Sequence, residues 1–283
     1  MGNALFIVWR ESIEAILVVG ILYAWIRESG GGHIGLRHLF GGVALGIALA
    51  GLLAAAILGM QTQLAGAALE AFQVAIVLAA AGLIVQMVFW MRRHSRELKK
   101  NLEAGLRQAA VGGKGYAAAL LAAVAVGREG SETVLFLYGL AMERSGAELG
   151  SMMAGALAGL VLALLSAWVI EKARRFVSWR IFFKVTEALL LLLGASLVAS
   201  AVEKSIALEW LPALVEPLWD SSFALDETSA LGSLVAGFTG YRSQPPLTLA
   251  ICYGAYWAAV WWLARRSGVV NAELRPAAKA GAA

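Results

Sequence analysis

Long apolar runs alternate along the chain with short polar connections. A helix that crosses a bilayer needs about 20 mostly apolar residues. On this rule the sequence predicts seven transmembrane helices, at about 3–27, 38–60, 66–91, 115–142, 149–171, 181–202 and 246–265. We therefore expect an all-α polytopic membrane protein. Residues 1–266 would form one transmembrane domain, and residues 267–283 a disordered cytoplasmic tail.

Composition supports this interpretation. Hydrophobic residues make up 60% of the chain and charged residues only 15%, whereas a soluble domain is about half apolar and about a quarter charged. The first apolar run lacks a basic leading segment and is interrupted by charges, so we expect it to remain as a helix rather than act as a cleaved signal peptide. The single cysteine excludes an internal disulfide and a cluster of thiolate ligands.

Basic residues fall almost entirely on alternate connections. The connections after the first, third and fifth predicted helices, together with the C-terminal segment, hold 18 of them, whereas the other connections hold only Arg144, Lys204 and Arg242. Cytoplasmic connections are the ones enriched in Lys and Arg, so the N-terminus is expected outside and the C-terminus in the cytoplasm. Because these charges are spread over four short juxtamembrane segments, the net charge of +4 does not indicate nucleic-acid binding.

Two charged patterns with nearly the same spelling interrupt the first and fourth apolar runs. They are Arg10-Glu11-Ser12-Ile13-Glu14 and Arg128-Glu129-Gly130-Ser131-Glu132. Ionised groups are costly inside a membrane and usually mark a functional site. Residues three and four apart share a helix face, so each pattern projects its two glutamates together and lets its arginine reach the second glutamate.

Two such helices lying face to face would gather four carboxylates with two supporting arginines. The candidate metal ligands are Glu11, Glu14, Glu129 and Glu132, and the supporting residues are Arg10 and Arg128. At about 1.5 Å per residue, both glutamate pairs fall between the midplane and the outer half of a core about 30 Å thick. An all-oxygen ligand set suits hard cations, among them Fe³⁺, Mg²⁺, Ca²⁺ and Mn²⁺, with Fe²⁺ also compatible.

Histidine is absent from the interior of the predicted helices, since His38 stands at the very start of the second. The three histidines, which are His33, His38 and His94, fall in the expected inner connections. Their placement argues against a bis-histidine haem and against a histidine-based zinc or copper site.

The spacing of polar and small residues predicts an internal repeat. The first charged pattern precedes the second by 118 residues, and Glu70 on the third helix precedes Glu187 on the sixth by 117. Small residues that permit close packing recur on the second and fifth helices, at Gly42 and Gly46 and at Gly155 and Gly159. We expect two three-helix repeats, about 1–92 and about 115–202, followed by the helix at about 246–265. With three spans each, the repeats are inverted relative to one another.

Glu70 and Glu187 are candidates for an entry and exit path. The predicted topology places Glu70 near the outer surface and Glu187 near the cytoplasmic surface. The alternative is that each carboxylate only stabilises the N-terminus of its own helix through the helix dipole.

The doubled pattern, on the first and fourth of seven predicted helices, resembles the oxidase-dependent iron permease family and its bacterial EfeU-type members. The resemblance covers nearly the whole chain, with Ser12 standing where the family prefers glycine. It implies a bacterial inner-membrane iron permease whose four motif glutamates handle iron as the transported substrate, with no permanently bound cofactor. It also implies periplasmic iron-binding proteins or redox (ferroxidase) partner proteins.

Three other interpretations of the doubled pattern remain open. The first is a proton- or cation-coupled carrier for another divalent metal or a small solute. The second is a metal-dependent hydrolase that uses Ser12 or Ser131, although no histidine or lysine is nearby to activate either hydroxyl. The third is a pair of structural salt bridges, Arg10 with Glu14 and Arg128 with Glu132, which would leave Glu11 and Glu129 unpaired.

The connection at about 203–245 is too apolar for a simple linker. We expect a short interfacial helix in it, with Trp210 and Trp219 at the level of the lipid headgroups, where tryptophan is enriched.

Overall fold

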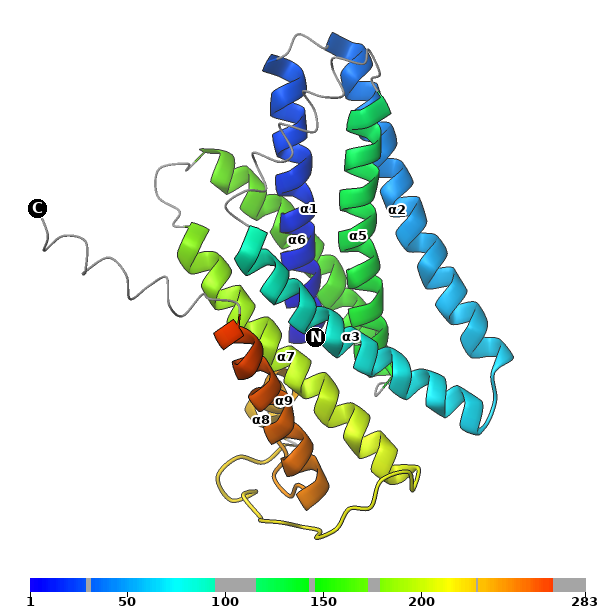
Figure 1. The fold of residues 1–283 in the computed structure, drawn as a ribbon, viewed down its shortest axis with the longest axis vertical. Coiled ribbons are helices and arrows are strands. Elements are labelled where there is room, and N and C mark those ends of the chain that lie inside the picture. The colour runs from blue at the N-terminus through cyan, green and yellow to red at the C-terminus, as the bar shows by residue number, and fades with distance from the viewer. Residues whose placement is uncertain (29–31, 95–115, 143–145, 173–178, 228, 267–283) are drawn as a thin grey trace, which may run out of the picture. The chain divides into compact units, whose positions relative to one another are not determined.

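The computed structural model describes residues 1–28, 32–94, 116–142, 146–172, 179–227 and 229–266. These residues form the helices shown in Figure 1, which are α1 (Gly2–Glu28), α2 (Gly32–Gln63), α3 (Ala67–His94), α5 (Tyr116–Ala141), α6 (Ala147–Lys172), α7 (Trp179–Ala207), α8 (Ala230–Thr239) and α9 (Leu247–Arg266). Each of the seven expected long helices is present as a helix, and α8 lies in the connection at about 203–245, where a short helix is expected. The expected cytoplasmic tail at 267–283 lies outside the described residues.

The chain is a polytopic membrane protein. In the described part of the chain, five helical segments have the length and hydropathy of a membrane span, namely Gly35–Gln63, Ala67–Arg92, Ala147–Val169, Lys184–Ala207 and Leu247–Arg266. The helices α1 and α5 contain 27 and 26 residues, and both carry the charged pattern within an otherwise apolar sequence.

Several helices extend beyond their predicted ends. The helix α2 begins at Gly32 rather than near residue 38, and α7 continues to Ala207 rather than to 202. As a result His38 lies in α2, within the candidate span Gly35–Gln63, so its expected place in a connection is wrong. Leucine and arginine are good helix formers, and the charged end of an apolar run therefore need not end the helix.

The short helix expected in the connection at about 203–245 is present as α8, but it contains neither Trp210 nor Trp219. Trp210 and Trp219 lie in irregular chain. Pro212 and Pro217 explain the difference, because proline lacks the N–H that a helix interior needs. Both tryptophans are about half exposed, at 46% and 50%.

Hydrogen bonds hold this irregular segment against the start of α9. The backbone N–H of Leu218 donates to the Pro245 carbonyl at 2.9 Å, and that of Leu247 donates to the Val215 carbonyl at 2.9 Å. At the end of α8, Gly240 adopts the left-handed conformation with φ 71°, which glycine adopts without strain.

The described helices belong to two compact units. The first unit comprises Met1–Val77 and Glu97–Thr186, and the second comprises Leu78–Arg96 and Glu187–Ala283. The helices α3 and α7 each continue from the first unit into the second. Each unit therefore contains parts of both expected repeats.

In the first unit, α1 lies against α5 and α6, and α2 lies against α5 (Figure 1). The contact of α2 with α5 depends on Gly42 and Gly46, which approach the backbone of α5. A Cβ at Gly42 would overlap the carbonyl group of Ala119. A Cβ at Gly46 would lie 2.8 Å from the Gly127 nitrogen and 2.9 Å from the Ala123 oxygen.

The contact of α6 with α1 follows the same plan. A Cβ at Gly155 would lie 2.5 Å from the Met1 carbonyl oxygen, and one at Gly159 would overlap the Leu5 oxygen and lie 3.1 Å from the Trp9 nitrogen. The α1 positions are related to Ala119, Ala123 and Gly127 on α5 by the same 118-residue offset as the charged pattern. Each motif helix thus packs on the glycine face of the second helix of the other expected repeat.

A pair of neighbouring glycines tests this packing. An added Cβ at Gly41 meets no atom within 4 Å, whereas one at Gly42 meets the backbone of Ala119. Because backbone cannot rotate out of the way, we expect Gly42→Leu to destabilise the protein by at least about 1–3 kcal/mol. The matched Gly41→Leu variant should unfold in detergent at the parent's temperature. Equal melting temperatures for the two variants would contradict the close approach of α2 and α5.

In the second unit, α9 is fastened to α7 by a tyrosine. The Tyr256 hydroxyl donates to the Leu191 carbonyl at 2.8 Å. Gly194 leaves room for it, because a Cβ there would lie 2.6 Å from the hydroxyl oxygen. Nearby, Ala199 and Val202 of α7 form a buried cluster with Leu249 of α9.

Candidate metal site

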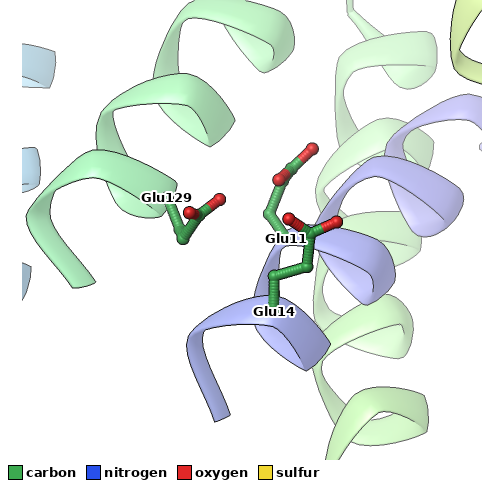
Figure 2. A group of neighbouring side chains, drawn as sticks. All are labelled: Glu11, Glu14 and Glu129. Atoms are coloured by element: carbon green, nitrogen blue, oxygen red, sulfur yellow. The ribbon is translucent and has the colours of Figure 1, made fainter. Parts of the chain in front are cut away.

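Three of the four motif glutamates meet between α1 and α5. Glu11, Glu14 and Glu129 each offer one carboxylate oxygen, and these oxygens all lie within 4.8 Å of one another. Figure 2 shows the three side chains turned towards the same space, with Glu11 and Glu14 from α1 and Glu129 from α5. Helical spacing places Glu11 and Glu14 on one face, and the packing of α5 on α1 supplies the third carboxylate.

Contact with α2 fixes the position of the second motif on α5. A Cβ at Gly130 would lie 2.7 Å from the Cβ of Ala50, so this position of α5 requires glycine. The corresponding position of the first motif is Ser12. The resemblance leads one to expect glycine at this position of the motif. In the second copy, the close contact with Ala50 of α2 explains that glycine.

Arg10 binds both glutamates of its own motif. Its Nη1 lies 2.8 Å from Glu11 Oε1 and its Nη2 lies 2.5 Å from Glu14 Oε1, and only 1% of its side chain is exposed. The expected pair with Glu14 is confirmed. The expectation that structural pairing would leave Glu11 unpaired is wrong, because one guanidinium spans both carboxylates.

Arg128 holds the fourth glutamate. Its Nε lies 2.9 Å from Glu132 Oε1 and 3.9 Å from Glu129 Oε1, and 35% of its side chain is exposed. The expected pair of Arg128 with Glu132 is confirmed. Glu132 is not among the three carboxylates whose oxygens lie within 4.8 Å of one another.

Buried carboxylate oxygens remain available to a ligand. Oε2 of Glu11, of Glu129 and of Glu132 is buried and has no hydrogen-bond partner among the described residues. A buried polar atom without a partner is costly, and a bound cation satisfies such oxygens. Carboxylate oxygens are ligands that hard cations prefer. Within the described ranges, no other group of three or more His, Cys, Asp or Glu side chains is arranged to hold a metal ion.

The serine of the second motif is occupied by its own helix. Ser131 Oγ donates to the Gly127 carbonyl at 2.6 Å, and Thr133 Oγ1 likewise donates to the Glu129 carbonyl at 2.8 Å. Each hydroxyl therefore bonds to the backbone one turn earlier. This arrangement does not activate Ser131 as a nucleophile, which a hydrolase would require.

Glu70 and Glu187 differ in their surroundings. Glu70 lies in the first turn of α3, as the sequence predicts, and its side chain is half-buried. Glu187 is the ninth residue of α7 and is buried, and its Oε2 lies 2.8 Å from Arg92 Nε. The alternative of a helix-dipole carboxylate is therefore wrong for Glu187.

Arg92 is the partner that sequence reasoning missed. It is one of the basic residues after the third predicted helix that indicate the topology, and it lies 95 positions from Glu187 in the sequence. The sequence gives one indication of this pair, which is that both residues are predicted to lie at the cytoplasmic side of the membrane.

Comparisons with known proteins agree with this picture. Residues 1–264 match the model of the Iron permease FTR1 family. The "Ferrous iron permease EfeU" of Yersinia pestis is 30% identical over 256 residues, which is 88% of each chain. That of Shigella sonnei (strain Ss046) is 29% identical over 281 residues, covering 98% of this chain and 96% of the relative. No solved structure matches the chain. The chain belongs to the iron permease family, whose members are membrane transporters and not enzymes.

Proposed function

We propose that this chain imports iron across a bacterial inner membrane and that its substrate is the ferrous ion. The observation that carries the proposal is the group of three carboxylates, the buried Glu11 and Glu129 and the half-buried Glu14, contributed by two copies of one motif. The names of the relatives support iron, and the ferrous form, as the substrate. Iron is the transported cargo, and no permanently bound cofactor is part of the proposal.

The proposed architecture has seven spans in two inverted repeats. It adds α1 and α5 to the five candidate spans, since both have the required length and satisfy their charges in ion pairs. The reciprocal glycine contacts, of α2 with α5 and of α6 with α1, support a two-fold relation between the halves. Inverted repeats commonly place a transporter's binding site near the midplane.

Iron would reach the three-carboxylate group from the outer side. We include periplasmic iron-binding or redox proteins as partners, on the strength of the family resemblance alone. The acidic side chains of the outward connection, such as Glu209 and Asp226, would raise the local concentration of cations.

A reconstituted transport assay tests this function. The purified chain in proteoliposomes should carry Fe²⁺ inward under anaerobic conditions, with and without an imposed pH gradient. The runner-up, a proton- or cation-coupled carrier for another divalent metal or a small solute, predicts no Fe²⁺ uptake above that of protein-free vesicles under either condition. Vesicles that take up no more Fe²⁺ than protein-free vesicles would contradict the proposed function.

The orientation makes a separate prediction. A reporter fused after Ala283, or inserted near Lys99, should signal from the cytoplasm, and one inserted near Asp226 should signal from the exterior. The physical reason is the concentration of 18 basic residues on one side. An exterior signal near Lys99 would contradict the inverted arrangement, because α5 would then run parallel to α1.

Glu70 and Glu187 are assigned to opposite mouths of the path. Removal of the Glu70 charge should weaken capture of the cation, so Glu70→Gln is expected to raise the iron concentration for half-maximal uptake about fivefold, with an unchanged maximal rate. Glu187→Gln should lower the maximal rate by a similar factor and leave the half-maximal concentration unchanged. Initial-rate measurements over a range of Fe²⁺ concentrations check both effects. Curves for both variants that overlay the parent's would contradict the assignment.

A further inference from the structure

The end of α9 carries two stacked pairs of arginine and tryptophan. The guanidinium carbon of Arg265 lies 3.4 Å from the centre of the Trp261 ring, and that of Arg266 lies 3.7 Å from the centre of the Trp262 ring. In each pair the arginine lies one helical turn beyond its tryptophan, on the same face of the helix. Because the pairs are one position apart in the sequence, they lie side by side at the end of α9.

Both pairs are open to the surroundings of the protein. The two tryptophans are 55% and 48% exposed, and the two arginines are exposed as well. In the part of the chain that the structure describes, neither arginine of α9 has a carboxylate partner, whereas Arg92 and Arg242 each pair with a glutamate. The two guanidinium groups of α9 are therefore available to an anion from outside the chain.

Stacking on an indole ring leaves the hydrogen-bond donors of a guanidinium free. The ring contacts the flat face of the guanidinium, whereas the N–H donors point outwards from its edge. This edge matches the oxygens of a phosphate group and can donate two parallel hydrogen bonds to them. The ring also restrains a long side chain, so less conformational freedom is lost when an anion binds. Each pair is thus preorganised to bind phosphate.

The pairs lie where a phosphate group of the bilayer would meet them. The candidate span Leu247–Arg266 ends at the two arginines, and tryptophan is enriched at the depth of the lipid headgroups. We propose that the two pairs form a binding site for the headgroup of an acidic phospholipid in the leaflet where α9 ends. The inference goes beyond the proposed function and does not depend on the transported ion.

The acidic headgroup is the occupant that the charge of the site favours. Two arginines bring two positive charges, and basic residues at a membrane surface attract anionic lipids. A zwitterionic headgroup such as phosphatidylcholine carries its own ammonium group, which cancels most of this attraction. The site should therefore prefer phosphatidylglycerol to phosphatidylcholine.

Two simpler explanations ignore the tryptophans. Basic residues in the last turn of a helix are favourable to the helix dipole, and basic residues in general gather at the cytoplasmic edge of a membrane. Arg27 and Arg37 represent this general case, because both are exposed and both are expected at the cytoplasmic edge. In the described ranges, neither of them stacks on an aromatic ring.

Site-resolved crosslinking of a lipid tests the inference. The full chain is placed in phosphatidylcholine vesicles that contain a little phosphatidylglycerol with a photoreactive headgroup, and the labelled residues are mapped by mass spectrometry. Unlabelled phosphatidylglycerol, further phosphatidylcholine and inorganic phosphate are then added as separate competitors. One double variant is Arg265→Gln with Arg266→Gln, and the other is Trp261→Leu with Trp262→Leu. The matched comparison within each molecule is the label around Arg27 and Arg37.

The end of α9 is expected to be labelled, and unlabelled phosphatidylglycerol should displace this label at a lower concentration than the label around Arg27 and Arg37. Further phosphatidylcholine and inorganic phosphate should not displace it. The arginine double variant should bind phosphatidylglycerol at the end of α9 roughly tenfold to thirtyfold more weakly. The tryptophan double variant should bind it about fivefold more weakly, although both positive charges remain. Neither variant should change the label around Arg27 and Arg37.

Three results would overturn the inference. A tryptophan double variant that binds phosphatidylglycerol as the parent does would show that general attraction to basic residues is sufficient. Equal displacement by phosphatidylcholine would show that the site does not select acidic lipids. Displacement by inorganic phosphate would show that the site takes free phosphate rather than a lipid. Because these measurements use no iron, they leave the proposed function unaffected.

Discussion

Glu129→Gln is expected to reduce iron uptake in proteoliposomes to the level of protein-free vesicles. Glutamine keeps the shape of the side chain but removes the charge and weakens the ligand, which leaves two carboxylates where three meet. Hard cations favour carboxylate oxygens, and the lost charge lies within a few ångströms of the ion, which corresponds to roughly a hundredfold weaker binding. Glu11→Gln and Glu14→Gln should have the same effect.

The matched control is Glu203→Gln, which removes a carboxylate paired with Arg242 in the second unit. It should transport iron as the parent does. All variants must be present in the membrane in equal amounts, as judged by immunoblotting. Normal iron uptake by Glu129→Gln would rule out the three-carboxylate site.

The second large effect is a loss of protein stability, which we expect when Arg10 is replaced. Its removal leaves Glu11 and Glu14 without the guanidinium that pairs with both, and breaking a buried ion pair from one side costs about 3–5 kcal/mol. We therefore expect Arg10→Gln to accumulate poorly and to unfold at a lower temperature than the parent. Arg10→Lys should show a partial defect, because lysine keeps the charge but lacks the planar fork that reaches two carboxylates.

A compensating variant separates electrostatics from packing. In the double variant Arg10→Gln with Glu14→Gln, one of the carboxylates that would lose its partner is removed together with the arginine. This variant should recover much of the lost accumulation without restoring transport. Arg128→Gln should accumulate better than Arg10→Gln, since Arg128 is much more exposed. Equal losses for the two single arginine variants would contradict the difference between the two motif copies.

Local features of the fold and of the site were predictable from the sequence. The pairs Arg10–Glu14 and Arg128–Glu132 follow from helical periodicity alone, because residues four apart lie on one face. The seven long helices follow from apolar runs that no proline interrupts. The recurrence of one charged pattern in two apolar helices was sufficient to identify Glu11, Glu14 and Glu129 as candidates.

Features that depend on tertiary packing were not predictable. Helical periodicity does not show that Arg10 reaches its sequence neighbour Glu11 as well as Glu14. Nor does the sequence show which glutamate of α5 joins Glu11 and Glu14, because this depends on how α5 lies against α1. The pair Arg92–Glu187 joins distant positions. The irregular chain around Trp210 was missed because its apolar composition outweighed the effect of two prolines on a helix.

The central claim is that Glu11, Glu14 and Glu129 together hold the transported iron. Anomalous scattering at the iron absorption edge, from crystals of the chain grown anaerobically with Fe²⁺, tests it most directly. The account predicts one anomalous peak between α1 and α5, within about 2.0–2.3 Å of an oxygen of each of the three glutamates, and no peak in crystals of Glu129→Gln. An iron peak that touches none of these glutamates in a transport-competent protein would contradict it.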